Sequence, residues 1–380
     1  MRIFIVLLAL FALVHAQNPL SRILRTIPNH RNTELNQKQI NAVRSYIRLA
    51  SIAACSRMQT GQVFKQAREC SLTTLCTDFE NVKVLDKFDR AQTGDIGGYL
   101  ARDDKRRTLI VSFQGTSSFK NIMTDLTANE VKHPDIAGAE VHRGFYNAAI
   151  KAKNYLLPKI KHEASKMGAM FREYEIEVIG HSLGGAVATL FTAELVNHGP
   201  KSIPNFNKRK IVLVTLGEPR VGDRKFVQFI NQQPFLQKRV TNRDDPVPFL
   251  PFKPVFARNS ILLESIPNYE SRDFEIHAHN NGKVIHCISA NDSACESDKG
   301  AFRKIGSELL DLAKSFFKSK VNLDDLDHFE FGGVITGCPT DNNKSTRSIG
   351  DTTLLEELLM QLGEIAEKDQ KDPKVNTPKI

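Results

Sequence analysis

The chain has 380 residues, of which 41% are hydrophobic and 25% charged, and it carries a formal net charge of +9. This length allows one large α/β domain with appendages or two medium ones, and either buries an ample core. The excess of basic residues suits an anionic lipid or cell surface, with plain solubility an equal alternative, and no nucleic-acid motif accompanies it. Beyond the first residues no apolar run is long enough for a membrane span, so no transmembrane segment is expected.

The first sixteen residues have the pattern of a secretory signal peptide. Arg2 precedes a short apolar run, and Val14-His15-Ala16 is a small-x-small cleavage signal. Removal of residues 1–16 would leave a secreted, extracellular protein. Residues 17–34 are polar, with two prolines and several arginines, and are predicted to be a flexible lead-in or pro-segment.

Six cysteines fit three disulfides, because an exported chain folds in an oxidising compartment. Spacing favours two small local loops and one long staple from the start of the domain to its end. These pairs are Cys70 with Cys76, Cys287 with Cys295, and Cys55 with Cys338. Zinc is the alternative, but without a Cys-x-x-Cys pair or a clustered histidine partner no metal site is expected. Sequons at Asn291 and Asn343 predict glycosylation.

After the lead-in, helical and strand patterns alternate. Apolar residues every three or four positions predict helices over 36–56, 142–160 and 183–195. Apolar and β-branched runs predict strands at 98–101, 108–113, 176–179, 211–217 and 240–248. The charged stretch 102–107 is predicted to be a hairpin turn. The alternation indicates the α/β class, with a mostly parallel central sheet and helices on both faces of a single domain over 35–340.

The string Gly180-His181-Ser182-Leu183-Gly184 joins one of these strands to the following helix, and we interpret it as a nucleophile elbow. Such a turn holds the serine hydroxyl out of the sheet on a strained backbone. Glycine is required two residues before and after the serine, because a Cβ there would collide with the neighbouring strand and helix. The string alone is weak evidence, but the flanking strand and helix patterns strengthen it.

A serine nucleophile needs a histidine to take its proton and a carboxylate to hold that histidine. In α/β-hydrolases they follow in the order Ser, Asp, His. After Ser182 the chain offers Asp244 or Asp245 at the end of a predicted strand. The late histidines, among which composition does not choose, are His277, His279, His286 and His328.

Acyl transfer also needs two donors for the oxyanion, one of which is the amide after the serine, that of Leu183. Thr116 follows the strand at 108–113 and is placed to give the other, with an ordinary polar turn as an equal alternative. The next piece, 119–125, mixes apolar and polar residues and suits a lid over the site.

Four strings together resemble the fungal-type class 3 lipase family. They are Gly-His-Ser-Leu-Gly-Gly at 180–185, Gly-Glu-Pro-Arg-Val-Gly-Asp at 217–223, Asp-Pro-Val-Pro at 245–248 and Asp-His-Phe-Glu-Phe-Gly at 327–332. They occur in the family's order and approximate spacing. The resemblance implies an α/β-hydrolase fold with Ser182 as the nucleophile, Asp245 as the acid and His328 as the base.

The resemblance further implies an oxyanion hole made by Thr116 and Leu183, and it supports the long disulfide. It also implies a lid at 117–125. Because the chain has no tryptophan, the lipid-facing side of that lid is expected to consist of Phe119, Ile122 and Met123.

Two amphipathic segments depart from or lie outside the family pattern. The link between Cys295 and His328 is longer than is usual in the family and has a basic helical pattern at 302–320. That helix is predicted either to dock on a lipid surface or to pack on the body. The tail, 341–380, contains a second amphipathic helical pattern.

The function expected is that of a secreted lipase, which hydrolyses ester bonds of acylglycerols through an acyl-enzyme without a cofactor. Two rival enzymes share the fold: phospholipase A1, which the basic charge favours, and a feruloyl-type esterase, which Glu218 in Gly-Glu-Pro-Arg resembles. A catalytically silent lipase-like binding protein would usually lack a triad member, and all three are present. The expected partner is a lipid or ester substrate at a lipid–water interface, and the oligomeric state is left open.

Overall fold

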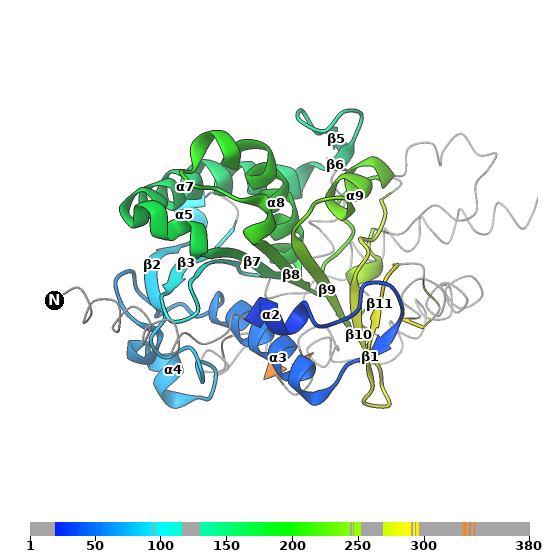
Figure 1. Cartoon of the computed structure of the whole chain (residues 1–380), viewed down its shortest axis with the longest axis horizontal. Helices are drawn as coiled ribbons and strands as arrows, with labels where there is room; N and C mark the ends of the chain where they lie inside the picture. The colour runs from blue at the N-terminus through cyan, green and yellow to red at the C-terminus, as the bar shows by residue number, and fades with distance from the viewer. Residues whose placement is uncertain are drawn as a thin grey trace, which may run out of the picture.

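The computed structural model describes residues 20–93, 96–115, 130–243, 245, 247–251, 269–289, 292, 294–295, 330–331, 334–335 and 338. Nine strands form one sheet in the order β1-β11-β10-β9-β8-β7-β4-β3-β2 (Figure 1). Their bounds are β1 Thr33–Glu34, β2 Lys83–Phe88, β3 Gly98–Asp103, β4 Thr108–Phe113, β7 Glu175–His181, β8 Ile211–Leu216, β9 Leu236–Asn242, β10 Glu275–Ala278 and β11 Val284–Cys287.

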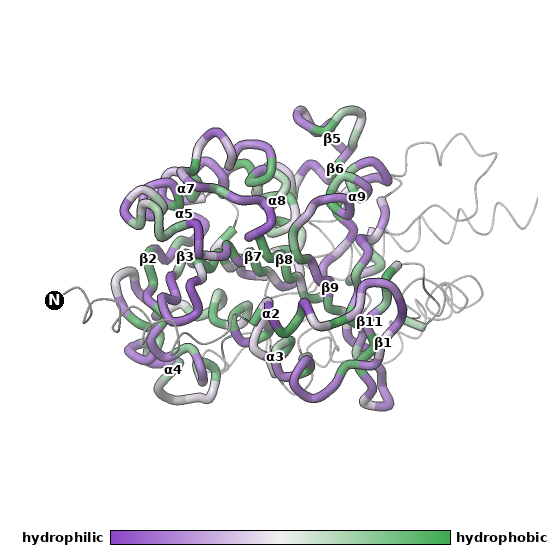
Figure 2. Tube along the Cα trace, viewed as in Figure 1, coloured by the Kyte–Doolittle hydropathy of each residue, from purple (hydrophilic) through white to green (hydrophobic). Residues whose placement is uncertain are grey.

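The five central strands, from β4 to β10, are parallel, and the strands at both edges are antiparallel. Residues of β4, β7 and β8 are buried along their whole length, as expected for strands that are covered on both faces. Figure 2 shows the matching hydrophobic character along β8. The α/β class and the mostly parallel centre predicted from the sequence are therefore confirmed.

Helices cover both faces of the sheet (Figure 1). One face carries α5 (Arg90–Thr93), α7 (Arg143–Met167), α8 (Leu183–Ser202) and α9 (Arg224–Asn231). The other face carries α2 (Leu20–Leu24) and α3 (Gln37–Ile52), with α4 (Arg68–Leu72) beside them. Each face has its own cluster of buried apolar side chains, so the sheet separates two cores.

Short elements complete the described chain. Strands β5 (Glu130–Lys132) and β6 (Glu140–His142) form an antiparallel hairpin, as do β12 (Glu330–Phe331) and β13 (Val334–Ile335). The 3₁₀ helices are Phe64–Gln66, Gly168–Glu173, Lys208–Lys210 and Val247–Phe249. None of the helices in the described ranges combines the length and apolar character that a membrane span requires.

The hairpin of β3 and β4 shows why a charged stretch can belong to a strand. The sequence predicts that the first strand ends at residue 101, but β3 continues to Asp103. The Asp103 carboxylate accepts from Arg106 at 2.6 Å, and both residues are buried. The opposite charges neutralise each other within the turn, so burial of both is tolerated.

The sheet also extends further than the range of the predicted strands, 98–248. Strands β10 and β11 lie beyond that range, and a hydrophobicity pattern does not predict them because their sequences contain polar residues. Glu275 of β10 is fully buried because Arg239 of the neighbouring β9 donates to it at 2.8 Å. The ion pair forms only when the two strands are adjacent, so the pattern of either strand alone does not reveal it.

The described part of the lead-in, residues 20–34, is packed on the body, which differs from the flexible lead-in expected, whereas the alternative of a pro-segment stays a prediction. Leu24 and Ile27 are 1% and 2% exposed. Ser21 donates a short hydrogen bond to the Glu175 carboxylate at the start of β7. The apolar side chains among the arginines form a docking face, and strand β1 adds to the sheet edge.

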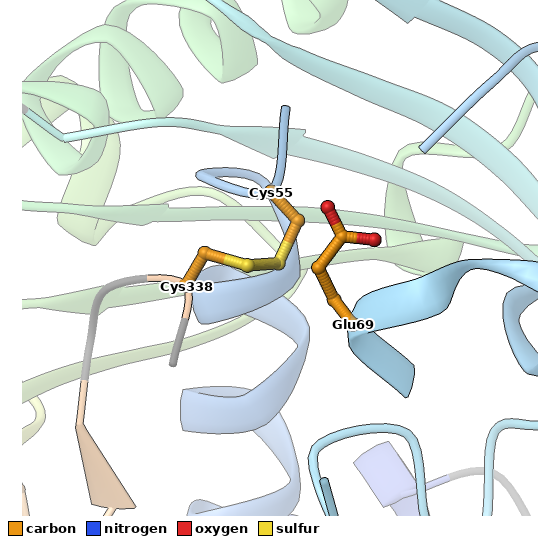
Figure 3. Close-up of side chains that lie close together, drawn as sticks. All are labelled: Cys55, Glu69 and Cys338. Carbon is orange, nitrogen blue, oxygen red and sulfur yellow. A yellow bond between two sulfur atoms is a disulfide. The ribbon is translucent and has the colours of Figure 1, made fainter. Parts of the chain in front are cut away.

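The structure contains the three predicted disulfides: Cys55–Cys338, Cys70–Cys76 and Cys287–Cys295. The first joins the chain just after α3 to a residue 283 positions later. Figure 3 shows the buried carboxylate of Glu69 beside this disulfide. One oxygen of Glu69 accepts from the Arg57 amide at 3.0 Å, which anchors the α4 region to the same place.

Candidate active site

Ser182 lies between the last residue of β7 and the first residue of α8. Its backbone angles are φ 57° and ψ −129°. A positive φ is rarely adopted by a residue with a Cβ, and such a conformation costs about 1–3 kcal/mol. The surrounding fold holds this strained turn in place: the Ser182 amide donates to Leu216 O of β8 at 2.8 Å, and the Ser182 carbonyl accepts from Gly185 in α8.

The glycines on either side of Ser182 are required by close backbone contacts, as the sequence predicts. A Cβ on Gly180 would lie 2.0 Å from Gly184 O, and a Cβ on Gly184 would lie 2.5 Å from Phe113 O at the end of β4. Gly115 has the same constraint, because its Cβ would lie 2.8 Å from His181 O and 3.2 Å from the Ser182 Cβ. The loop that follows β4 therefore lies directly against the serine.

The hydroxyl of Ser182 has no hydrogen-bond partner among the described residues, and the residue is 0% exposed. A buried hydroxyl without a partner costs free energy that the fold must offset elsewhere. Unsatisfied groups of this kind are found where a group must react or bind. Burial together with backbone strain at one serine is therefore the strongest feature of the site.

Asp245 follows β9 by three residues and is 1% exposed. Its Oδ1 accepts from the Val247 amide at 2.9 Å, and its own amide donates to Asn242 O, so the side chain is oriented by the backbone. Strands β7, β8 and β9 are parallel neighbours, which brings their carboxyl ends to one edge of the sheet. Ser182 and Asp245 both follow strand ends at that edge. The rival acid, Asp244, lies outside the described residues.

Among the candidate histidines, His286 is excluded as the base by its surroundings. Its Nε2 is 2.8 Å from the Lys238 ammonium. Burial and then the Lys238 charge lower the pKa of His286 to about 3, and such a weak base does not accept a serine proton near neutral pH. His277 Nδ1 is in hydrogen-bond contact with Thr241 Oγ1 at 2.8 Å. His328 lies outside the described residues, so its role stays a prediction.

Leu183 is the first residue of α8 and therefore has an amide without an acceptor inside the helix, as an oxyanion donor requires. Several other predicted residues lie outside the described part of the chain. They are Thr116, the lid residues Phe119, Ile122 and Met123, and the sequon residues Asn291 and Asn343. The basic segment 302–320 and the tail are likewise outside it.

Glu218, which the sequence connects with a feruloyl-type esterase, is a buried structural residue. It is 2% exposed and forms an ion pair of 2.7 Å with Arg272. Thr215 donates to it at 2.6 Å, and Thr189 of α8 donates a short hydrogen bond. Its carboxylate therefore braces α8 against the end of β8. Sequence reasoning missed Arg272, because no local motif surrounds it.

A parallel-centred sheet flanked by helices, with a strained serine between a strand and a helix, defines an α/β-hydrolase. The sequence profile described as "Lipase (class 3)" matches residues 110–255. Over this part of the chain the sequence is therefore similar to the class 3 lipases, in agreement with the resemblance of its motifs.

Named relatives agree with this assignment. The chain is 28% identical over 214 residues to a lipase of Rhizomucor miehei, and the match covers 56% of this chain and 54% of that protein. It is 32% identical over 224 residues to the secreted mono- and diacylglycerol lipase 1 of Fusarium solani, covering 58% and 62%. The chain thus spans about half the length of the first of these curated relatives.

Solved structures share the fold. The Rhizomucor miehei lipase propeptide complex aligns with a TM-score of 0.61 at 24% identity, over 80% of this chain and 84% of that one. The structure of a triacylglycerol lipase whose catalytic centre is formed by a serine protease triad aligns with a TM-score of 0.61 at 23% identity. It covers 81% of this chain and 99% of that one.

Proposed function

We propose that this protein is a secreted carboxylic ester hydrolase that acts on acylglycerols through an acyl-enzyme on Ser182. The observation that carries the proposal is the buried, strained serine whose hydroxyl has no partner among the described residues. The class 3 lipase profile over 110–255 supports the reaction class. Similarity to the secreted mono- and diacylglycerol lipase of Fusarium solani supports both secretion and the acylglycerol substrate, in line with the signal-peptide pattern at 1–16.

In the proposed mechanism, His328 takes the Ser182 proton as the serine oxygen attacks the ester carbonyl. The amides of Leu183 and Thr116 stabilise the oxyanion, and Asp245 stabilises the imidazolium. Collapse of the tetrahedral intermediate breaks the bond to glycerol, whose oxygen receives the proton from His328. A water molecule, deprotonated by His328, then releases the fatty acid and restores the serine.

Two findings bear on the rival functions. Glu218, whose motif resembles that of a feruloyl-type esterase, is buried and paired with Arg272, so it gives that alternative no specific support. The net charge of +9 still favours phospholipase A1 as the second candidate. A silent binding protein would have no need for a strained serine whose hydroxyl lacks a partner among the residues that the structure describes.

The direct test replaces Ser182 by alanine in the secreted protein. We expect hydrolysis of a triacylglycerol emulsion to fall by about 1,000-fold or more, because the covalent step is lost while binding remains. Ser165→Ala, at an exposed position of α7, is the matched control and should keep full activity. Undiminished turnover by folded Ser182→Ala protein would refute the mechanism.

The substrate class is tested on the wild-type enzyme with a soluble short-chain ester, below and above its solubility limit. A jump in rate above the limit supports a lipase whose proposed lid, 117–125, opens at a lipid–water interface. Saturation without a jump indicates an esterase. Faster hydrolysis of phosphatidylcholine vesicles than of triacylglycerol emulsions would transfer the assignment to phospholipase A1.

A further inference from the structure

A second cluster of reactive side chains lies away from the serine, between α8 and the β5–β6 hairpin. His133 and Asp135 come from the connection that follows β5, and Glu194 and His198 come from α8. Glu194 and His198 are four positions apart in the helix and therefore lie on one face. Glu194 is twelve residues along α8 from Ser182, or roughly 18 Å at the helical rise of 1.5 Å per residue. The cluster is thus separate from the proposed active site.

The polar atoms of the cluster converge on one place. One ligand-type atom from each of His133, Asp135 and Glu194 lies within 4.8 Å of the others. His133 Nε2 is 3.3 Å from Glu194 Oε1. His198 Nε2 is 3.2 Å from Asp135 Oδ2 and 3.2 Å from Glu194 Oε2. A cation placed among these atoms would meet nitrogen and oxygen donors from four side chains.

Two of these atoms are buried and lack a hydrogen-bond partner within the described ranges. The side chains of His133 and Glu194 are 0% and 1% exposed. Although His133 Nε2 and Glu194 Oε1 are 3.3 Å apart, their alignment does not complete a hydrogen bond. Leaving a buried polar atom unsatisfied costs about 1–3 kcal/mol, so this pair indicates a ligand between the two groups.

Neighbouring groups hold both side chains in orientation, as they do around protein metal sites. Lys153 Nζ binds Glu194 Oε2 at 2.7 Å and leaves Oε1 directed at the cluster. The rings of Tyr146 and Phe226 flank the His133 imidazole, with centroids 5.3 and 6.1 Å away. The Asp135 amide donates to His133 Nδ1 at 3.3 Å.

The charge balance also calls for a cation. The two carboxylates of the cluster, those of Asp135 and Glu194, are accompanied by one ammonium, that of Lys153. Imidazole nitrogen together with carboxylate oxygen suits Zn²⁺, whereas Ca²⁺ and Mg²⁺ prefer oxygen ligands alone.

We propose that His133, Asp135 and Glu194, with His198 as the fourth ligand, form a Zn²⁺ site that joins α8 to the β5–β6 hairpin. Zn²⁺ at this place stabilises the folded state, because it binds the assembled cluster and not the unfolded chain. Since the site is roughly 18 Å from Ser182 along the helix, Zn²⁺ takes no part in ester hydrolysis. The proposal does not depend on the function proposed above.

The test is a Zn²⁺ titration of the chelator-treated, full-length protein in competition with a fluorescent zinc indicator. We expect one Zn²⁺ per chain and a rise in the thermal unfolding temperature. Asp135→Asn, a conservative change at a half-exposed ligand, should weaken Zn²⁺ binding by about 10-fold or more, and Glu194→Gln likewise. Circular dichroism confirms that each variant is folded.

Matched controls are Asp78→Asn and His162→Gln, an exposed carboxylate and an exposed imidazole outside the cluster, which should bind Zn²⁺ as the wild type does. Ser182→Ala should also bind normally, which separates this test from that of the active site. No binding at about 100 μM Zn²⁺, a free energy weaker than about 5.5 kcal/mol, would overturn the proposal. Equal binding by the folded Asp135→Asn and Glu194→Gln variants would do the same.

Discussion

At the scale of single residues, the interior of this protein contains ionisable groups whose state depends on their surroundings. Glu177 of β7 is buried behind α3 and accepts from the Tyr46 hydroxyl at 2.7 Å. Burial raises the pKa of Glu177 to about 8, with the nearby charge of Glu175 adding to the effect and the Tyr46 hydrogen bond opposing it. This carboxyl group is therefore protonated in the folded state at neutral pH.

The consequence is a stability that declines with rising pH. The unfolded chain loses the Glu177 proton near pH 4.3, about the ordinary pKa of glutamate, whereas the folded state keeps it to about pH 8. Between these values the folded state binds more protons, so the free energy of unfolding falls by up to about 1.4 kcal/mol per pH unit. Below about pH 4.3 the stabilising contribution of Glu177 is fully present, and above about pH 8 it is lost.

We predict that Glu177→Gln flattens this decline, because glutamine keeps the Tyr46 hydrogen bond and carries no proton to lose. Urea unfolding at pH 5, 6.5 and 8 measures the free energy of unfolding at each pH. The stability of Glu177→Gln relative to the wild type should be greatest at pH 8. Glu34→Gln, at an exposed carboxylate of β1, is the control and should keep the wild-type slope. Identical slopes in wild type and Glu177→Gln would contradict the prediction.

At the scale of elements, the ion pair of Glu218 and Arg272 connects three of them. Glu218 lies in the loop after β8, Arg272 precedes β10, and both reach Thr215. Arg272 also donates to Gln237 of β9 at 3.0 Å. The Arg272 guanidinium thus contacts polar side chains of β8, of β9 and of the loop after β8.

We predict that Arg272→Met destabilises the protein by about 3–5 kcal/mol, because the Glu218 carboxylate is left buried without its cation. The double variant Glu218→Gln with Arg272→Met should recover much of this loss, since no charge remains. The control is Arg107→Met, which removes an exposed ion pair with Glu173 and should cost less than about 1 kcal/mol. Chemical unfolding measures all three, and a loss below about 1 kcal/mol for Arg272→Met would show the pair to be dispensable.

At the scale of the whole molecule, the Cys55–Cys338 disulfide connects residues 283 positions apart. A crosslink over so long a loop restricts the unfolded chain strongly, and the chain-entropy treatment gives about 5.6 kcal/mol. Removal of both cysteines as Cys55→Ser with Cys338→Ser should therefore lower the free energy of unfolding by about that amount.

The matched control removes Cys70 and Cys76, whose separation of 6 residues corresponds to about 2 kcal/mol in the same treatment. Both double variants are measured by denaturant unfolding of the secreted protein. Equal losses for the two would show that loop length does not determine how much these disulfides stabilise the chain.

The local parts of the fold could be predicted because their causes are local. The strand, turn and helix around Ser182 follow from β-branched residues, glycine placement and helical spacing, which are all visible within a short window. The disulfide pairing could be predicted because two pairs of the six cysteines are close in sequence, which leaves one long pair. Strand β10 was missed because the partner of its Glu275 is Arg239, on another strand.

The sequence by itself determined the α/β order of elements, the elbow at Ser182 and the class 3 lipase resemblance, because periodicity, glycine sterics and motif order are written along the chain. Tertiary structure decided the packing of the lead-in, the burial of Ser182, the structural role of Glu218, and the meeting of His133 with Glu194. Each of these depends on contacts between residues far apart in the chain, and the cost or benefit of a buried charge exists only once its partner is beside it.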